Sequence, residues 1–259
     1  MQRDVMESGL LSPEQLHTFE ERGWVSLPGF FSPAKTAEIL EWMAELEAMP
    51  EKPGRNMVYY EDSLLREGER VVQRIEHFCP NHAGFDTLVR GGSLFEAVSQ
   101  VLGGTACLFK DKVNFKMPGG AGFEPHQDQQ AGWSKFAPLF VTALVCVDQA
   151  TPENGCLEMA DCARLSGLIG EEWKPLTGEE MSGFSFTSIP TEPGDVLLFD
   201  SYVPHQSRSN LTAGRRRLLY LTYNLAADGD HRSQYFDEKR KNFPPDIERN
   251  PGKKYEFRV

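Results

Sequence analysis

The stretch GFEPHQDQQAGW, residues 122–133, places a histidine and an aspartate two positions apart, after a glycine and before a tryptophan. In an extended strand, side chains at positions i and i+2 project from the same face. His126 and Asp128 can therefore occupy adjacent positions around one metal ion. Because HxD pairs also arise by chance, the pair alone is weak evidence for a metal site.

A second stretch, GDVLLFDSYVPHQSRSN at residues 194–210, supplies a further histidine, where a buried strand is expected to run into a turn. Two histidines and one carboxylate on one side of an ion form the facial triad of non-haem Fe(II) oxygenases. The opposite side then stays open for substrate and O₂. We therefore predict that His126, Asp128 and His205 are the metal ligands. The remaining histidines are expected to be ordinary structural residues: His17, His77, His82 and His231.

An arginine run follows the second histidine. Ser207 lies two positions after His205, and Arg215, Arg216 and Arg217 come shortly afterwards. On a strand, consecutive arginines face opposite sides, so at least one should be a solvated surface charge. An arginine that points inward beside a hydroxyl is well suited to bind a carboxylate through two N–H groups.

Composition limits the function classes. The chain has 259 residues and a net charge of −11, which argues against nucleic acid or an anionic membrane as the main partner. The longest apolar run, residues 138–147, is too short to span a bilayer. The first residues lack the apolar core of a secretory signal. Five cysteines without CxxC spacing favour a reducing, cytoplasmic location.

The sequence pattern changes near residue 105, from mostly helix-like to mostly strand-like segments. Residues 1–104 are expected to be mostly helical, with Ser-Pro helix starts at Ser12 and Ser32, a helix at 91–104 and one short strand in WVSLPGF. Residues 105–225 hold strand-like runs, namely ACLFKDKVNFKM, FVTALVCVD, GDVLLFD and RRLLYLTYNLA.

These patterns predict a single domain over residues 1–259. Its fold class is mainly β with flanking helices, and a jelly roll or related barrel is the expected architecture. Residues 1–104 would form a helical buttress and residues 105–225 the core. Residues 226–259, which are polar and interrupted by prolines, would wrap the surface or cover an opening.

The order HxD, distant His, Ser at +2 and Arg at +11 resembles the Fe(II)/2-oxoglutarate dioxygenases of the phytanoyl-CoA dioxygenase superfamily. The segments KDKVNFKMPGGAGFEPHQD and ENGCLEMA share this resemblance, which covers roughly residues 15–225. It implies a double-stranded β-helix (cupin-like) core and iron bound by the triad. It also implies that Arg216 and Ser207 grip the distal carboxylate of 2-oxoglutarate. Asn114 would contact this cosubstrate near the metal.

The resemblance implies hydroxylation of an sp³ carbon, with 2-oxoglutarate and O₂ converted to succinate and CO₂. The presence of Asp128 favours hydroxylation, because related halogenases carry a small residue in place of this carboxylate. One departure concerns the substrate. Where the family often has a Pro-Gly-Ser-His segment, this chain reads EMADCARLSG. The substrate therefore cannot be copied from the phytanoyl-CoA enzymes.

The expected substrate pocket is polar. Its predicted members are Lys112, Gln127, Gln129 and Trp133, with Gln130 as a further candidate. Lys110 and Lys116 share a strand face with Lys112 but are expected to be solvated at the strand ends. This set suits a small polar substrate that carries an anionic group. The segments HQDQQAGW and FPPDIER resemble bacterial 2-aminoethylphosphonate dioxygenases, which makes that phosphonate the named candidate.

Several alternatives remain open at the level of sequence. The same mechanism could act on an amino acid, an acyl-CoA or a secondary metabolite. A noncatalytic, metal-free barrel would have no need of the triad together with a carboxylate clamp. A zinc hydrolase could use the same three ligands, since ligand type alone does not separate zinc from iron. The sequence does not predict an oligomeric state.

Overall fold

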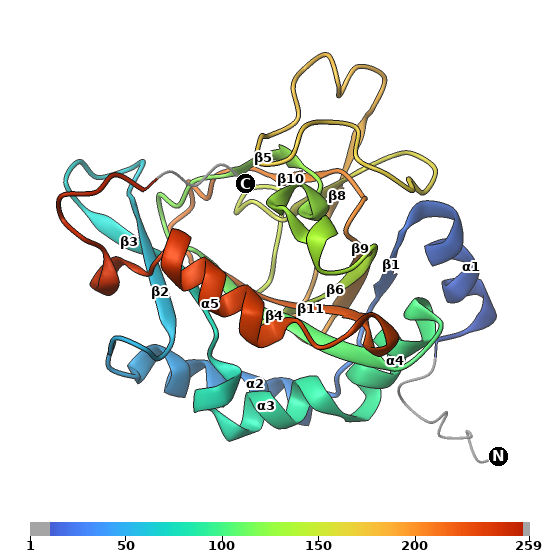
Figure 1. The fold of residues 1–259 in the computed structure, drawn as a ribbon, viewed down its shortest axis with the longest axis horizontal. Coiled ribbons are helices and arrows are strands. Elements are labelled where there is room, and N and C mark those ends of the chain that lie inside the picture. Colours follow the sequence, from blue (N-terminus) through green and yellow to red (C-terminus); the bar gives the residue numbers. More distant parts are fainter. Residues whose placement is uncertain (1–10, 256–259) are drawn as a thin grey trace.

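The computed structural model describes residues 11–255 and contains two antiparallel β-sheets (Figure 1). The larger sheet has the spatial order β1 (Trp24–Leu27), β9 (Val196–Asp200), β6 (Phe140–Cys146), β11 (Arg216–Leu225), β4 (Ala106–Lys116), β3 (Arg70–Glu76) and β2 (Met57–Asp62). The smaller sheet has the order β5 (Phe123–His126), β10 (His205–Ser207), β7 (Leu157–Ala160) and β8 (Phe186–Ile189). A mainly β architecture with flanking helices is what the sequence predicts.

Five α-helices and five 3₁₀ turns complete the described chain. The α-helices are α1 (Pro13–Arg22), α2 (Pro33–Ala48), α3 (Ala83–Arg90), α4 (Gly92–Leu102) and α5 (Arg232–Asn242). The 3₁₀ turns are η1 (Cys79–Asn81), η2 (Asp128–Ala131), η3 (Trp133–Lys135), η4 (Ala226–Asp228) and η5 (Asp246–Glu248). The start of α1 follows its sequence signal, because the Ser12 hydroxyl accepts a hydrogen bond from the Gln15 amide at 3.2 Å.

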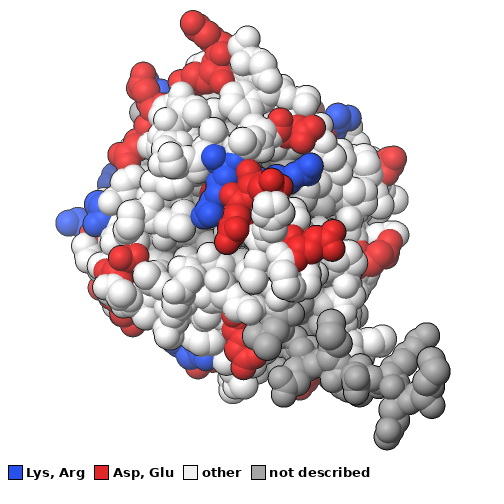
Figure 2. Space-filling model, turned by 90° about the vertical axis from the view of Figure 1, so that its right-hand side faces the viewer, with Lys and Arg blue, Asp and Glu red and all other residues white. Residues whose placement is uncertain are grey.

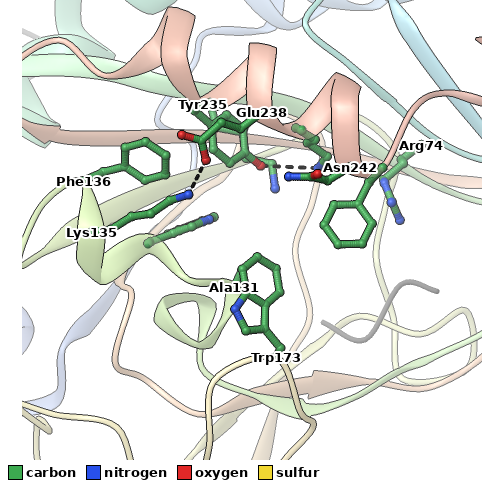
Figure 3. A pocket seen from close by; sticks show the side chains of 12 residues that line it. Arg74, Ala131, Lys135, Phe136, Trp173, Tyr235, Glu238 and Asn242 are labelled. Atoms are coloured by element: carbon green, nitrogen blue, oxygen red, sulfur yellow. Dashed lines mark hydrogen bonds and ion pairs between the residues drawn. The ribbon is translucent and has the colours of Figure 1, made fainter. Parts of the chain in front are cut away.

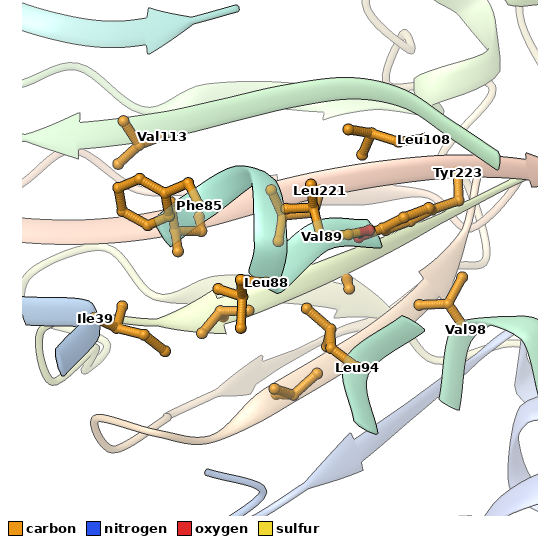
Figure 4. Packing of buried hydrophobic residues seen from close by; sticks show 14 of the residues in the cluster. Ile39, Phe85, Leu88, Val89, Leu94, Val98, Leu108, Val113, Leu221 and Tyr223 are labelled. Atoms are coloured by element: carbon orange, nitrogen blue, oxygen red, sulfur yellow. The ribbon is translucent and has the colours of Figure 1, made fainter. Parts of the chain in front are cut away.

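The main hydrophobic core lies between the helices and one face of the larger sheet, the face turned away from the smaller sheet. Val113 of β4 and Leu221 of β11 point away from the smaller sheet and are fully buried. They lie in one cluster with Phe85 and Val89 of α3 and Leu94 of α4 (Figure 4). Because side chains alternate along a strand, this packing turns the other face of β4 and β11 toward the interior.

The interior face of β4 is polar. Lys110, Lys112, Asn114 and Lys116 occupy alternate positions along it. Opposite them on β11 lie Thr222, Tyr220, Leu218 and Arg216, in that order. Both lysines expected at solvated strand ends are instead buried, with Lys110 9% and Lys116 1% exposed. That expectation is wrong because segments distant in sequence cover both ends of the strand.

Two segments close the interior from outside. One is the long connection over residues 161–185, between β7 and β8. The other is α5, which lies across the molecule in Figure 1 and contributes Tyr235 and Phe236 to a cluster with Phe109 and Trp133. The chain after α5 is fixed to β2, since the Tyr59 hydroxyl donates to the Phe243 carbonyl at 2.7 Å. The described part of the C-terminal segment therefore packs against β2 and the cluster around Trp133.

The structure differs from the sequence-based expectation in several elements. Besides β1 in the predicted WVSLPGF segment, the N-terminal part supplies β2 and β3, and it holds the additional helix α3. Helix α5 lies in the polar C-terminal segment, where no helix is predicted from the sequence. The segments of β2 and β3 carry charged and polar residues that face the interior, so they lack a continuous apolar run.

The surface agrees with the acidic composition. On the face beside α1, acidic and basic side chains are interspersed, and the described residues form no extended basic patch there (Figure 2). Within residues 11–255, no helix combines the length and apolar character needed to cross a membrane.

Candidate active site

The three predicted metal ligands meet between the two sheets. Strands β5 and β10 are antiparallel neighbours, and His205 lies directly opposite His126 in their register. Gln127 is extended, with φ −107° and ψ 132°, so Asp128 at the start of η2 projects to the same side as His126. One ligand atom from each of the three side chains lies within 4.8 Å of the other two. Among the described residues, no other group of three metal-binding side chains is this close.

Backbone carbonyls fix the orientation of both imidazole rings. The Nδ1 atom of His126 lies 2.7 Å from the Glu124 carbonyl oxygen, and Nδ1 of His205 lies 3.0 Å from that of Val203. Each Nδ1–H therefore donates to a carbonyl, which leaves Nε2 with its lone pair available. Hydrogen bonds of this kind hold metal-binding histidines in the required tautomer.

The protonation states also suit a cation. Burial and the neighbouring His205 lower the pKa of His126 to about 3, so its ring is neutral at physiological pH. Burial by itself would raise the pKa of Asp128. The neighbouring His205 and His126 outweigh it and hold that pKa below its ordinary value. Neutral imidazoles and an ionised carboxylate are the forms that bind metals.

Gln127 secures the segment between the two ligands. Its side-chain amide donates to the carbonyls of Gly167 and Tyr202, and its Oε1 accepts from the Ile169 amide. The side chain thus joins this segment to the 161–185 connection and to the turn before His205. The amide of Gln127 is fully used in this way, so the side chain positions the ligands and does not line the predicted substrate pocket.

A second cluster lies at the Arg216 end of β11. Arg216 is 1% exposed, and its Nη2 donates to the Gly155 carbonyl at 2.6 Å. Its Nε and Nη1 are buried and have no hydrogen-bond partner among the described residues. Lys116, opposite on β4, donates to the Ser207 hydroxyl at 2.7 Å and to the Arg208 carbonyl. Burial and Arg216 lower the pKa of Lys116 to about 6.

This second cluster has the chemistry of a carboxylate clamp. Neither Arg216 nor Lys116 forms an ion pair with any described carboxylate, although buried charges normally require one. Gly155 makes the close packing possible. It has a φ of +78°, and a Cβ there would lie 2.2 Å from the Arg208 carbonyl oxygen. The family spacing indicated Arg216 and Ser207, whereas Lys116 was missed because it was expected to be solvated.

The neighbouring arginines face the opposite side of β11. Arg217 forms ion pairs with Asp148 at 2.7 Å and with Glu47 at 2.5 Å. Arg215 pairs with Glu47 at 2.8 Å, and its side chain is 44% exposed. The strand register therefore places Arg216 alone of the three in the interior.

Asn114 lies between the triad and this clamp on β4. It is 3% exposed, and its Oδ1 has no hydrogen-bond partner among the described residues. Its side chain and the Arg216 guanidinium both contact the hydroxyl of Tyr220, whose pKa is raised by burial. Thr142 supports the metal site from β6, with its Oγ1 3.5 Å from Asp128 Oδ2 and 2.9 Å from Thr222 Oγ1.

A cavity of about 420 Å³ opens beside α5 at the other end of β4 (Figure 3). Lys110 and Trp133 line it from the core, Tyr235 and Lys239 from α5, and Trp173 from the 161–185 connection. A second cavity of about 440 Å³ is lined by His126, and Arg74 borders both cavities. Trp133 is thus buried and also faces a cavity, whereas Gln129 lines neither and donates to the Ala137 carbonyl at 3.2 Å.

Comparison with known proteins identifies relatives along nearly the whole chain. The phytanoyl-CoA dioxygenase (PhyH) family model matches residues 19–218. A 2-aminoethylphosphonate dioxygenase of uncultured bacterium HF130_AEPn_1 is 39% identical over 243 residues, covering 93% of this chain and 92% of the relative. A methylphosphonate hydroxylase of Gimesia maris is 36% identical over 234 residues, covering 90% and 88%.

Solved structures show the same fold. EctD from S. alaskensis, crystallised with 2-oxoglutarate and 5-hydroxyectoine, superposes with a TM-score of 0.69 at 21% identity and covers 87% of this chain and 80% of its own. The double-stranded β-helix predicted from the sequence is confirmed by this similarity. The chain therefore belongs to the phytanoyl-CoA dioxygenase family of iron- and 2-oxoglutarate-dependent dioxygenases.

Proposed function

We propose that this dioxygenase hydroxylates an sp³ carbon of a small phosphonate, with 2-aminoethylphosphonate as the first candidate. His126, Asp128 and His205 would hold Fe(II) through two Nε2 atoms and one carboxylate oxygen. Arg216, Ser207 and Lys116 would bind the distal carboxylate of 2-oxoglutarate, and Asn114 would contact the cosubstrate closer to the metal.

The observation that carries the proposal is the guanidinium of Arg216, whose Nε and Nη1 have no acceptor among the described residues, inside a barrel that also holds the triad. Two buried guanidinium nitrogens without acceptors are costly unless a ligand supplies the acceptors. A carboxylate fits, because its two oxygens match a guanidinium edge. A noncatalytic barrel or a zinc hydrolase would leave this group unexplained.

When bound, iron and 2-oxoglutarate supply the oxidising chemistry, in which O₂, 2-oxoglutarate and a C–H bond give an alcohol, succinate and CO₂. The protein has three tasks of its own. The clamp orients the cosubstrate, the carbonyls of Glu124 and Val203 keep each histidine Nε2 free of its proton, and the covering segments exclude water. Positioning of this kind is the usual contribution of a protein to cofactor chemistry.

Two features support a phosphonate as substrate. The two most similar relatives described above are named for phosphonates, and both match about nine-tenths of this chain. The interior beside the triad is rich in cations, including Lys110, Lys112, Arg74 and Lys239, which suits a dianion. In methylphosphonate the only C–H bonds lie on the carbon attached to phosphorus. If one site accepts both compounds, that same carbon is the proposed position of hydroxylation.

Succinate formation tests the proposal. The purified protein with Fe(II), 2-oxoglutarate and O₂ is offered 2-aminoethylphosphonate, methylphosphonate, small amino acids or an acyl-CoA, and the product is identified by ³¹P NMR or mass spectrometry. We expect succinate and hydroxylated phosphonate in equal amounts. Coupling to an acyl-CoA or an amino acid, with neither phosphonate hydroxylated, would refute the substrate class.

The five cysteines are free thiols, in keeping with the proposed cytoplasmic location.

A further inference from the structure

Two interior lysines of β4 form no ion pair in the described part of the chain. Lys110 is 9% exposed, and its Nζ lies 5.3 Å from the ring centre of Trp133 and 5.7 Å from that of Tyr235. The Nζ of Lys112 lies 4.7 Å from the ring centre of Tyr220. Within residues 11–255, neither ammonium group donates a hydrogen bond or forms an ion pair, so aromatic faces are their main contacts.

Aromatic contacts alone do not account for two such charges. A desolvated cation–π contact stabilises an ammonium by less than its burial costs. An acceptor with negative charge would make up this difference. The pKa of Lys112 falls to about 7, chiefly through burial and then through Lys110, which agrees with an ammonium that lacks its counter-ion.

The surrounding charges leave a positive surplus. Glu76 is 0% exposed and pairs with Arg74 at 2.9 Å and with Lys239 at 2.5 Å. Its single carboxylate therefore already serves two cations before Lys110 and Lys112 are considered. Of the other nearby acids, Asp128 is assigned to the metal, and Glu238 pairs with Lys135 at the rim of the cavity (Figure 3).

The two lysines also have a suitable position. They lie two residues apart on one face of β4, about 7 Å between Cα atoms, so their long side chains can converge on one anion. Lys110 lies opposite Thr222 of β11, whose Oγ1 is 2.9 Å from that of Thr142, and Thr142 Oγ1 lies 3.5 Å from Asp128 Oδ2. An anion held between them is thus delivered beside the proposed metal site, on the side away from the Arg216 clamp.

We infer that Lys110 and Lys112 form the subsite that binds the phosphonate group of the substrate. Trp133, Tyr235 and Tyr220 hold the two ammonium groups in place, and Lys239 and Arg74 add positive charge from α5 and β3. A phosphonate has three oxygens and up to two negative charges, so it can accept from both lysines at once. The inference rests on the proposed function and assigns the recognition of its substrate to two residues.

Direct binding provides the test. The protein is loaded with Fe(II) and 2-oxoglutarate without oxygen, and 2-aminoethylphosphonate or methylphosphonate is titrated by calorimetry. We expect Lys110→Met and Lys112→Met each to weaken both phosphonates by about tenfold or more, which corresponds to about 1.4 kcal/mol. Lys135→Met is the matched control, because that lysine lines the same cavity as Lys110 but pairs with Glu238. It should bind both phosphonates within about twofold of the wild type.

The affinity for 2-oxoglutarate, measured separately, checks that each variant is folded, and Lys110→Gln replaces Lys110→Met if the latter does not fold. Wild-type phosphonate affinity in both the Lys110 and Lys112 variants would overturn the subsite, while wild-type turnover of phosphonates would leave the proposed function intact. A wild type that binds β-alanine but neither phosphonate would instead refute the proposed function, and the phosphonate subsite with it.

Discussion

Strand β4 presents lysines at both ends of its interior face, with Lys116 at one end and Lys110 and Lys112 toward the other. Lys110 and Lys116 are about 20 Å apart along the strand. At the first end, Lys116 and Arg216 form no ion pair with a carboxylate of residues 11–255. At the other end, Glu76 balances part of the charge through Arg74 and Lys239.

The difference indicates two kinds of anion site. The Arg216 end suits a ligand of constant structure, because its donors are fixed by Gly155, Ser207 and the strand register. At the Lys110 end, Glu76 already neutralises part of the charge, and the walls include α5 and the 161–185 connection, which are not part of either sheet. We interpret the first end as the cosubstrate site and the second as the substrate site.

The largest effect is expected between the two ends, at the triad. His126→Ala, Asp128→Ala or His205→Ala removes one of three protein ligands, so succinate formation should fall by more than about a hundredfold. Loss of a residue that merely supports a ligand already costs about 10- to 100-fold. Iron content and succinate release measure the effect. The control is the exposed His17, and near-normal turnover in any triad variant would remove that residue from the site.

Arg216→Ala should affect only the cosubstrate end. Loss of one side of a buried, charge-assisted pair costs about 2–3 kcal/mol, or roughly a hundredfold in the KM for 2-oxoglutarate. The KM for the phosphonate should change little. Arg215→Ala is the matched control, because its side chain pairs with Glu47 on the outer face. A large effect from the control, with Arg216→Ala silent, would contradict the strand register.

Lys116→Met should raise the KM for 2-oxoglutarate by about tenfold, less than Arg216→Ala, because one cation remains. The pH dependence is more specific. With a pKa of about 6, Lys116 is mostly neutral at pH 7.5 in the free protein, and a bound carboxylate favours its charged form. Binding should therefore take up close to one proton at this pH and weaken as the pH rises further.

Calorimetry in two buffers of different ionisation enthalpy measures this proton uptake, which should disappear in Lys116→Met. The same shift affects stability. Between pH 6 and 10 the unfolded chain binds more protons at this lysine than the folded one, so its contribution to the free energy of unfolding rises with pH. An equal pH slope in the wild type and in Lys116→Met would contradict the depressed pKa.

The smallest effect is expected from Tyr59→Phe at the substrate end. The change removes the hydrogen bond that ties the chain after α5 to β2, which is worth about 1 kcal/mol. The free energy of unfolding in urea should fall by about that amount. Because α5 lines only the substrate-side cavity, the KM for the phosphonate should rise several-fold while that for 2-oxoglutarate stays constant. Equal changes in both KM values would argue against this division.

Much of the fold could be predicted because local signals agreed with it. The strands at residues 106–116, 140–146, 196–200 and 216–225 carry β-branched and aromatic runs, and the first helix has a serine cap, a proline and a terminal glycine. Strand β3 was missed because Arg74 and Glu76 interrupt any apolar pattern. The buried carboxylate of Glu76 is accounted for by cations that surround it in the fold, including Arg74 on β3 itself and Lys239 on α5.

Some site residues could likewise be predicted from local spacing, whereas the surroundings of others could not. The positions of His126, Asp128, His205 and Arg216 followed from spacing, since the i, i+2 rule and the family order place them together. The burial of Lys110 and Lys116 did not, because it depends on α5 and on the turn at Arg208, far away in sequence. Spacing along one strand gives the face of a side chain but not what covers it.

The register that sets His205 opposite His126 has a consequence for how the protein is assembled. A slip of one residue between β5 and β10 would turn His205 to the other face of the sheet. Only the correctly paired sheet therefore brings all three ligands together. The long chain between the two histidines must be folded before they meet, and such distant contacts form slowly. We therefore expect iron to load onto the folded barrel, and the rate of iron uptake during refolding to report when the smaller sheet has found its pairing.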